Sequence, residues 1–79
     1  MDVSKQRRLE GEIAKNIWSV IRKMRKRGTT GCSVQTMLQM TPTPRGLFSV
    51  TPRQYEEAFR RVAAGFVFIY TEYDQCVTN

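Results

Sequence analysis

The sequence predicts a mostly helical domain with a small β-hairpin, in the winged helix-turn-helix arrangement of three helices followed by a wing. Three observations support this fold class. A long basic segment carries apolar residues at helical spacing, a complete helix-capping signature begins at Thr51, and an aromatic and β-branched run lies near the C-terminus. The chain has 79 residues, enough for one domain, and we expect 1–79 to form a single unit.

The first helix is predicted from about Ser4 to Arg27. Its apolar residues recur at intervals of three and four positions, which places them on one face of a helix. Ser4 is a suitable N-cap, and Gly28 or Gly31 is expected to end the helix. Trp18 flanks the apolar stripe, and we expect it to anchor the core rather than to serve as a ligand platform. The stripe consists of Leu9, Ile13, Ile17, Val20, Ile21 and Met24.

A shorter second helix is predicted between a linker and a loop. Thr29 to Cys32 is a linker or a strand of one rung, and Ser33 then caps a helix over Val34 to Met40. Two prolines and a glycine in Thr41 to Ser49 prevent a continued helix and predict a loop. The residues that this helix is expected to bury are Val34, Met37 and Leu38.

The third helix has the most complete signature. Thr51 is the expected N-cap, Pro52 occupies the first helical position, and Gln54 completes a T-x-x-Q capping box. Gly65 is expected to end the helix. The inward face is predicted from the i, i+3, i+4, i+7 spacing of Tyr55, Ala58, Phe59 and Val62.

The C-terminal segment predicts a hairpin. Phe66 to Thr71 is aromatic and β-branched, Glu72 to Gln75 is typical of a turn, and Cys76 to Thr78 is expected to return as an antiparallel strand. Three helices followed by such a hairpin give the winged-helix layout.

Composition argues against an enzyme, a metal site and a membrane span. The chain has no histidine and none of the common phosphate-binding or nucleophile motifs. Glu56 and Glu57 are adjacent, so on a helix they point about 100° apart and do not converge as an acid/base pair. Two cysteines are too few for a structural zinc site, and we expect reduced thiols, with a Cys32–Cys76 disulfide as the alternative. The longest nearly apolar run, Val62 to Tyr70, is far shorter than a membrane span. We therefore expect an intracellular binding module that needs no metal or cofactor.

The net charge of +6 belongs entirely to the segment up to Arg27, which contains the predicted first helix. Up to Arg27 there are nine basic and three acidic residues, whereas from Gly28 onward there are four of each. The basic end of this helix is a candidate for phosphate contacts that carry no sequence information. A solvated helix end is an equally good explanation, because cations there complement the helix dipole. The candidate residues are Arg22, Lys23, Arg25 and Lys26.

The outward face of the third helix is a second nucleic-acid candidate. Arginine and glutamine side chains can read guanine and adenine edges in the major groove of duplex DNA. Glu57 lies in the middle of this face and repels phosphate, and the predicted hairpin contains no lysine or arginine. The candidate residues are Arg53, Gln54, Arg60 and Arg61.

The acidic hairpin also suggests a protein partner. The third helix and the hairpin are expected to frame a groove with Tyr70 and Tyr73 on its walls and Glu72 and Asp74 on its rim. A basic amphipathic helix would fit such a groove. The alternative is that Tyr70 lies inside the sheet.

Two stretches resemble a known family. The run GCSVQTML at 31–38 is similar to the second-helix entry of the C-terminal winged-helix domain of the middle subunit of replication protein A. Residues 50–65, followed by IYTEYD at 69–74, resemble its third helix and hairpin. The chain departs from the family in two extra residues after Gly65, a longer proline-rich loop and a strongly basic first helix.

The resemblance implies a protein-recruitment module in a nuclear DNA replication or repair complex. Position by position, it places Ile69, Tyr70, Thr71, Glu72 and Asp74 at or near a groove that captures partner helices. The leading interpretation is therefore a protein-interaction domain of such a complex. The alternative is direct binding of duplex DNA through the third helix and the basic end of the first, and a purely architectural subunit is a third possibility.

Overall fold

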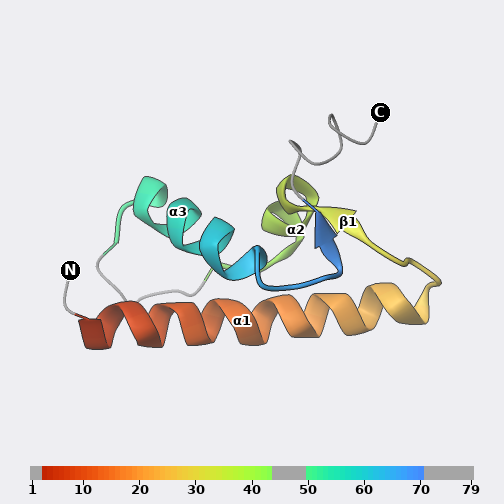
Figure 1. The fold of residues 1–79 in the computed structure, drawn as a ribbon, viewed down its shortest axis with the longest axis horizontal. Coiled ribbons are helices and arrows are strands. Elements are labelled where there is room, and N and C mark those ends of the chain that lie inside the picture. The colour runs from red at the N-terminus through yellow and green to blue at the C-terminus, as the bar shows by residue number, and fades with distance from the viewer. Residues whose placement is uncertain (1–2, 44–49, 71–79) are drawn as a thin grey trace.

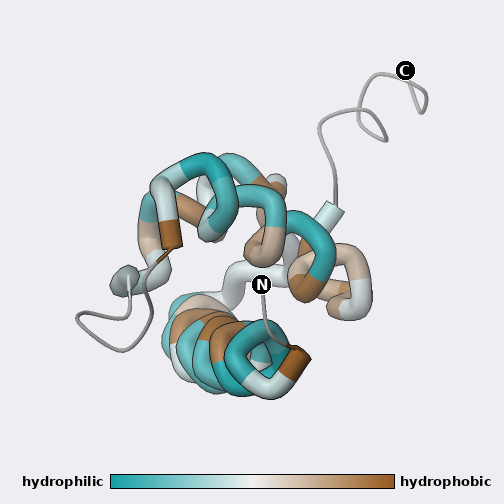
Figure 2. The backbone as a smooth tube through the Cα atoms, turned by 90° about the vertical axis from the view of Figure 1, so that its left-hand side faces the viewer, coloured by the Kyte–Doolittle hydropathy of each residue, from teal (hydrophilic) through white to brown (hydrophobic). Residues whose placement is uncertain are grey.

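The computed structural model describes residues 3–43 and 50–70. This part of the chain is mostly helical and has one small two-stranded sheet. The elements in chain order are α1 (Val3–Lys26), β1 (Cys32–Ser33), α2 (Val34–Met40), α3 (Pro52–Ala63) and β2 (Ile69–Tyr70). α1 runs along one side of the molecule, and the other four elements lie together against one face of α1 (Figure 1, Figure 2).

α1 confirms the predicted first helix and its stripe, but it already begins at Val3, so Ser4 lies within the helix and is not its N-cap. The six stripe residues are all buried, and they face α2, α3 and the sheet. The helix ends at Lys26, and the chain turns away at Gly28, whose φ of +88° is a backbone conformation that favours glycine. The N–H of Thr29 donates to Met24 O, and the N–H of Gly28 donates to Arg25 O, both at 3.0 Å. These two bonds form a Schellman motif, which satisfies the last carbonyls of the helix.

The predicted role of Trp18 as a core anchor is wrong. Its side chain is 47% exposed, while the stripe residues around it are at most 7% exposed. The physical reason is angular: at about 100° per residue, Trp18 lies one step beyond Ile17 and away from the centre of the buried face. A large apolar side chain is buried only if its position around the helix faces the core.

The caps of α2 and α3 confirm the predictions made for them. The Ser33 hydroxyl accepts from the Thr36 N–H, and the Thr51 hydroxyl accepts from the Gln54 N–H at 3.1 Å. The Gln54 side chain accepts in return from the Thr51 N–H at 3.0 Å, which completes the capping box. Of the predicted inward residues of α3, Tyr55, Ala58 and Phe59 are buried and Val62 is partly buried against the core. Leu38, predicted to be buried in α2, is partly buried.

The predicted antiparallel hairpin is not what the described strands form. Only Ile69–Tyr70 of the expected strand is extended, and it pairs in parallel with Cys32–Ser33. The preceding residues make turns instead: the N–H of Phe66 donates to Ala63 O, and the N–H of Ile69 donates to Phe66 O. The chain therefore arrives beside β1, where Cys32 N–H donates to Phe68 O at 3.1 Å. The expected turn and return strand over 72–78 lie outside the described residues.

Candidate nucleic-acid interface

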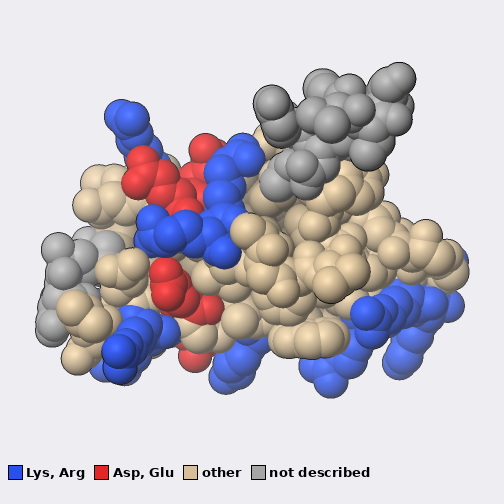
Figure 3. All heavy atoms as spheres, viewed as in Figure 1, with Lys and Arg blue, Asp and Glu red and all other residues tan. Residues whose placement is uncertain are grey.

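A line of cations follows the outer face of α1. Arg8, Lys15, Arg22 and Lys26 are spaced by seven, seven and four residues, so they stack along one side of the helix, opposite the buried stripe. All four are exposed. We call these four residues the basic stripe. It extends about 27 Å at 1.5 Å per residue. Figure 3 shows basic side chains along the edge of the molecule that α1 forms.

The basic stripe is largely uncompensated by nearby acids. Within residues 3–43 and 50–70, only Lys15 of the four forms an ion pair, with Glu12 at 3.7 Å. The Lys15 side chain is 76% exposed, and such a pair contributes little in water. Arg22 and Lys26 are one turn apart and carry like charges, so they repel each other. The face therefore carries positive charge that the described fold does not neutralise.

The arginines of α3 differ, because each lies beside a carboxylate. The Arg61 guanidinium reaches across to Glu10 on α1 at 3.5 Å. Arg60 also donates to the side chain of Gln35 on α2 at 3.3 Å. The two pairs within α3 are Arg53–Glu57 at 3.5 Å and Arg60–Glu56 at 3.7 Å. In Figure 3 the acidic side chains gather over α3 and the neighbouring part of α1.

The predicted nucleic-acid residues thus divide into two separate groups. Gln54 takes part in the capping box, and each α3 arginine lies beside a carboxylate at the surface, so this group offers mixed charge. The group at the end of α1 offers positive charge alone. Sequence reasoning missed Arg8 and Lys15, which extend this group along the helix. The seven-residue spacing from Arg8 to Lys15 to Arg22 was the signal that identifies them.

An aromatic cluster borders the basic stripe. The rings of Trp18 and Phe66 meet edge to face, with centroids 5.4 Å apart and an interplanar angle of 72°. The Arg25 guanidinium carbon lies 5.9 Å from the Trp18 ring and 5.6 Å from the Phe68 ring. Arg25 is therefore held by two aromatic rings, and Trp18 is held by Phe66 and Arg25.

An open hollow lies on α1 beside Trp18. Its walls are Lys15, Asn16, Trp18, Ser19 and Arg22. Ser19 is small and lies on the same side as the two cations, which leaves room between them. The hollow combines one aromatic ring with polar and positively charged groups.

The residues predicted to bind a partner helix are only partly described. Ile69 is buried at 8% exposure, and Tyr70 is exposed at 38%. The Ile69 side chain lies in the core. That these residues lie at or near a partner groove stays a prediction. Thr71, Glu72 and Asp74 lie outside the described residues.

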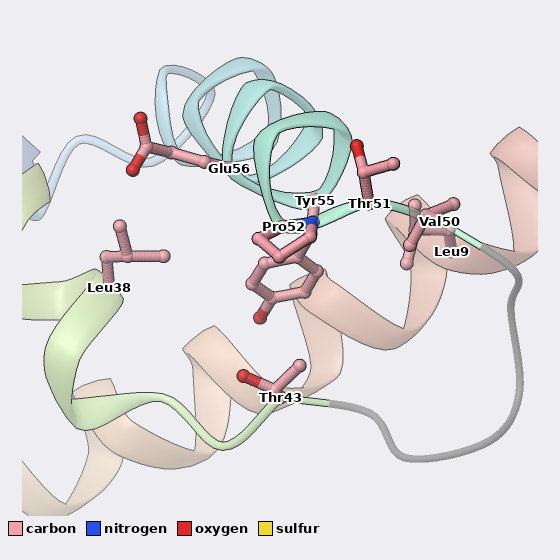
Figure 4. Close-up of a pocket in the computed structure, with 8 residues that line it drawn as sticks. All are labelled: Leu9, Leu38, Thr43, Val50, Thr51, Pro52, Tyr55 and Glu56. Atoms are coloured by element: carbon pink, nitrogen blue, oxygen red, sulfur yellow. The ribbon is translucent and has the colours of Figure 1, made fainter.

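A second cavity lies between α3, α1 and the chain around Thr43 and Val50 (Figure 4). The Tyr55 ring is buried beside this cavity. Among the described residues, no group lies at a distance and angle that would make a hydrogen bond to the Tyr55 hydroxyl. Burial raises the pKa of this hydroxyl, and nearby Thr43 acts in the opposite direction. The chain between Thr43 and Val50 lies outside the described residues, and we assign no ligand to this cavity.

Other side chains of the described residues supply no second site. Cys32 is a buried free thiol, and its burial raises its pKa. A disulfide to Cys76 falls outside the described residues. Residues 3–43 and 50–70 hold no group of three or more Cys, Asp or Glu side chains that would bind a metal ion. No helix in this part of the chain is both long and apolar enough to cross a bilayer.

No family model matches the sequence, and neither a curated protein nor a solved structure shows significant similarity to it. The resemblance to the replication protein A domain therefore stays a prediction from short motifs. The function has to be argued from the geometry of this chain.

Proposed function

We propose that this protein is a nucleic-acid-binding module that contacts the phosphate backbone through the basic stripe of α1. The observation that carries the proposal is the contrast between the two helices. The cations of α3 are paired with carboxylates, whereas Arg8, Arg22 and Lys26 have no acidic partner within the described residues.

The energetics of phosphate binding favour the unpaired group. A lysine or arginine that neutralises a phosphate releases a condensed counterion, and this release supplies most of the non-specific affinity. An arginine that already lies beside a carboxylate gains less free energy from binding a phosphate. It also brings that carboxylate close to the phosphate, and the two negative charges repel each other. Four contacts from the basic stripe predict a slope of log affinity against log salt of about −3.6 for duplex DNA and about −2.8 for a single strand.

A winged-helix architecture is the second part of this proposal. The order helix, strand, helix, helix, strand is that of a winged helix up to its last strand, although β1 and β2 pair in parallel. Nuclear Overhauser contacts are the test. Contacts that place residues 76–78 as a strand antiparallel to Ile69–Tyr70 would support the proposal, and helical contacts over 71–79 would refute it.

The functional test compares two double variants that remove the same charge. Arg22→Gln with Lys26→Gln weakens the basic stripe, and Arg53→Gln with Arg60→Gln is the matched control on α3. Binding of a labelled oligonucleotide is followed by fluorescence anisotropy at several salt concentrations. The α1 variant is expected to lower both affinity and slope, the slope by about 1.8 for duplex DNA, while the α3 variant stays close to the unsubstituted protein.

Three outcomes would overturn this assignment. Equal losses in both double variants would mean that only net charge matters. A selective loss in the α3 variant would favour α3 as the DNA-reading helix. If no oligonucleotide binds and a basic helical peptide instead shifts the NMR signals of Tyr70, the protein-recruitment function predicted from the sequence is the better explanation.

A further inference from the structure

We propose that the α1 face prefers single-stranded over duplex nucleic acid, with Trp18 as a platform on which an unpaired base stacks. This inference rests on the proposed function and goes one step further, because it names the form of nucleic acid. Trp18 is exposed to solvent, although its neighbours Ile17 and Val20 on the buried face of α1 are at most 7% exposed.

The Trp18 ring is fixed before any ligand arrives. Phe66 packs edge-on against it at 5.4 Å, and Arg25 lies 5.9 Å from its centroid. A ring held in this way loses little conformational freedom on binding, so contact with a ligand costs little ordering entropy. Arg25 lies over part of the ring, and Trp18 as a whole remains 47% exposed to a ligand.

The surroundings of the ring match a nucleotide. Lys15 and Arg22, both in the basic stripe, line the hollow beside Trp18, about 10.5 Å apart along the helix axis. A base stacked on the indole between them has its flanking phosphates near cations on either side. Asn16 and Ser19 add hydrogen-bonding groups to the same hollow. Stacking on an aromatic ring beside a basic track is the general mode by which proteins hold single strands without reading sequence.

The contacts continue toward the C-terminal end of α1. Arg25 lies against both Trp18 and Phe68, and Val67 beside Phe68 is fully exposed. A second hollow here is lined by Arg25, Gly28, Thr29, Thr30, Val67 and Phe68. A strand that follows the basic stripe past Trp18 therefore meets another cation with apolar surface next to it.

A duplex cannot use the ring in this way. Its bases are stacked on each other and present only their edges in the grooves, so the indole finds no free π face. A lipid surface suits the hollow less well. Four of the five residues that line it are polar or charged, whereas an interfacial helix buries a continuous apolar face.

Two conservative substitutions separate stacking from packing. Trp18→Phe keeps an aromatic face, and Trp18→Leu keeps apolar bulk against Phe66 but removes the π system. Tyr70→Ala is the matched control, since it removes a second exposed aromatic ring, which belongs to β2 and not to α1. Circular dichroism confirms that each variant is folded.

Binding is measured by anisotropy of labelled oligothymidylate of about 20 nucleotides and of a duplex of equal length, at about 50 and 200 mM salt. The unsubstituted protein is expected to bind the single strand more tightly. Trp18→Leu is expected to weaken single-strand binding by about 5- to 150-fold with an unchanged salt slope, because no phosphate contact is lost. Trp18→Phe is expected to keep most of the affinity, and Tyr70→Ala all of it. Trp18 is the only tryptophan, so its fluorescence in the unsubstituted protein is expected to be quenched by the single strand.

The outcomes distinguish this inference from the proposed function. If Trp18→Leu binds the single strand as tightly as the unsubstituted protein, or if duplex is preferred, the stacking platform is refuted. The proposed function still stands in that case, provided that the Arg22 and Lys26 variant loses affinity. If neither oligonucleotide binds, both proposals fail. Tighter binding to vesicles of phosphatidylserine and phosphatidylcholine, with a blue shift of the Trp18 emission, would overturn the single-strand assignment in favour of a membrane surface.

Discussion

Truncation of Phe59 is the most direct test of the fold that positions the interface. Its ring is completely buried, on the face of α3 that packs against α1, with the Tyr55 ring 6.2 Å away between centroids. Replacing such a ring by a methyl group removes its transfer free energy and leaves a cavity, at a cost of about 3–5 kcal/mol. A chain of this length has a total stability of about 4–12 kcal/mol. Phe59→Ala is therefore expected to lose about a quarter or more of it.

Urea unfolding followed by far-ultraviolet circular dichroism gives the measurement. Phe59→Leu is the graded variant, because it keeps apolar volume, and we expect it to cost about 1 kcal/mol. With a slope of about 1 kcal/mol per molar urea, its midpoint falls by about 1 M. Arg53→Ala is the surface control on the same helix. Its side chain is 90% exposed, so its midpoint is expected to stay nearly unchanged.

A specific result would refute this reasoning. If Phe59→Ala and Phe59→Leu both unfold at the same urea concentration as the unsubstituted protein, Phe59 is not in a packed core. The contact between α3 and α1 would then be wrong, and with it the position of the C-terminal turn beside Trp18.

Three further perturbations follow from local geometry. Thr51→Ala removes the acceptor of a first-turn N–H of α3 and is expected to cost about 1 kcal/mol in urea unfolding. Gly28→Ala places a Cβ at φ +88° and is expected to cost about 1 kcal/mol, while Gly11→Ala, inside α1 with open space around it, is expected to stabilise by about 0.5–1 kcal/mol. Burial raises the pKa of Cys32 above 9.0, so folding favours its protonated form, and the thiol contribution to stability is lost as pH rises above 9. In a Cys76→Ser background, Cys32 is expected to react with iodoacetamide much more slowly in the folded than in the urea-unfolded protein; equal rates would contradict its burial.

The helices were predictable because their signals are local. The stripe from Leu9 to Met24 repeats at helical spacing over more than four turns, and this pattern permits only one face to be buried. The Thr51 capping box fixes the start of α3, since the cap and the first turn satisfy each other within four residues. Neither inference needs knowledge of the rest of the chain.

The sheet was not predictable in the same way, because its pairing is long-range. Cys32 and Ile69 are 37 positions apart, and nothing local to either strand specifies the other as partner. A hairpin is the simplest expectation for a β-branched run near a turn. The turns at Phe66 and Ile69 instead deliver the chain to β1, and this depends on where α3 ends in space.

The candidate interface was half predicted for a related reason. Charge counts placed the net charge on the first helix, but they did not show which cations are paired. The Arg61–Glu10 pair joins α3 to α1 and appears only when the two helices are packed together. The Trp18, Arg25 and Phe68 cluster likewise needs the C-terminal turn in place beside α1.

The helix dipole is the competing explanation for the basic end of α1, and the position of the basic stripe limits it. The dipole favours cations within the last turn of a helix by about 0.3–1 kcal/mol, which accounts for Lys23, Arg25 and Lys26. It does not account for Arg8, which lies in the second turn of α1, or for Lys15 in the middle, because the dipole acts only within the first and last turns. Like charges one turn apart add a small cost of their own. An anionic partner that runs along the whole helix compensates all of these cations at once. A polyanion should therefore raise the thermal midpoint of the unsubstituted protein more than that of the Arg22→Gln and Lys26→Gln double variant. A dipole-only origin predicts no such difference.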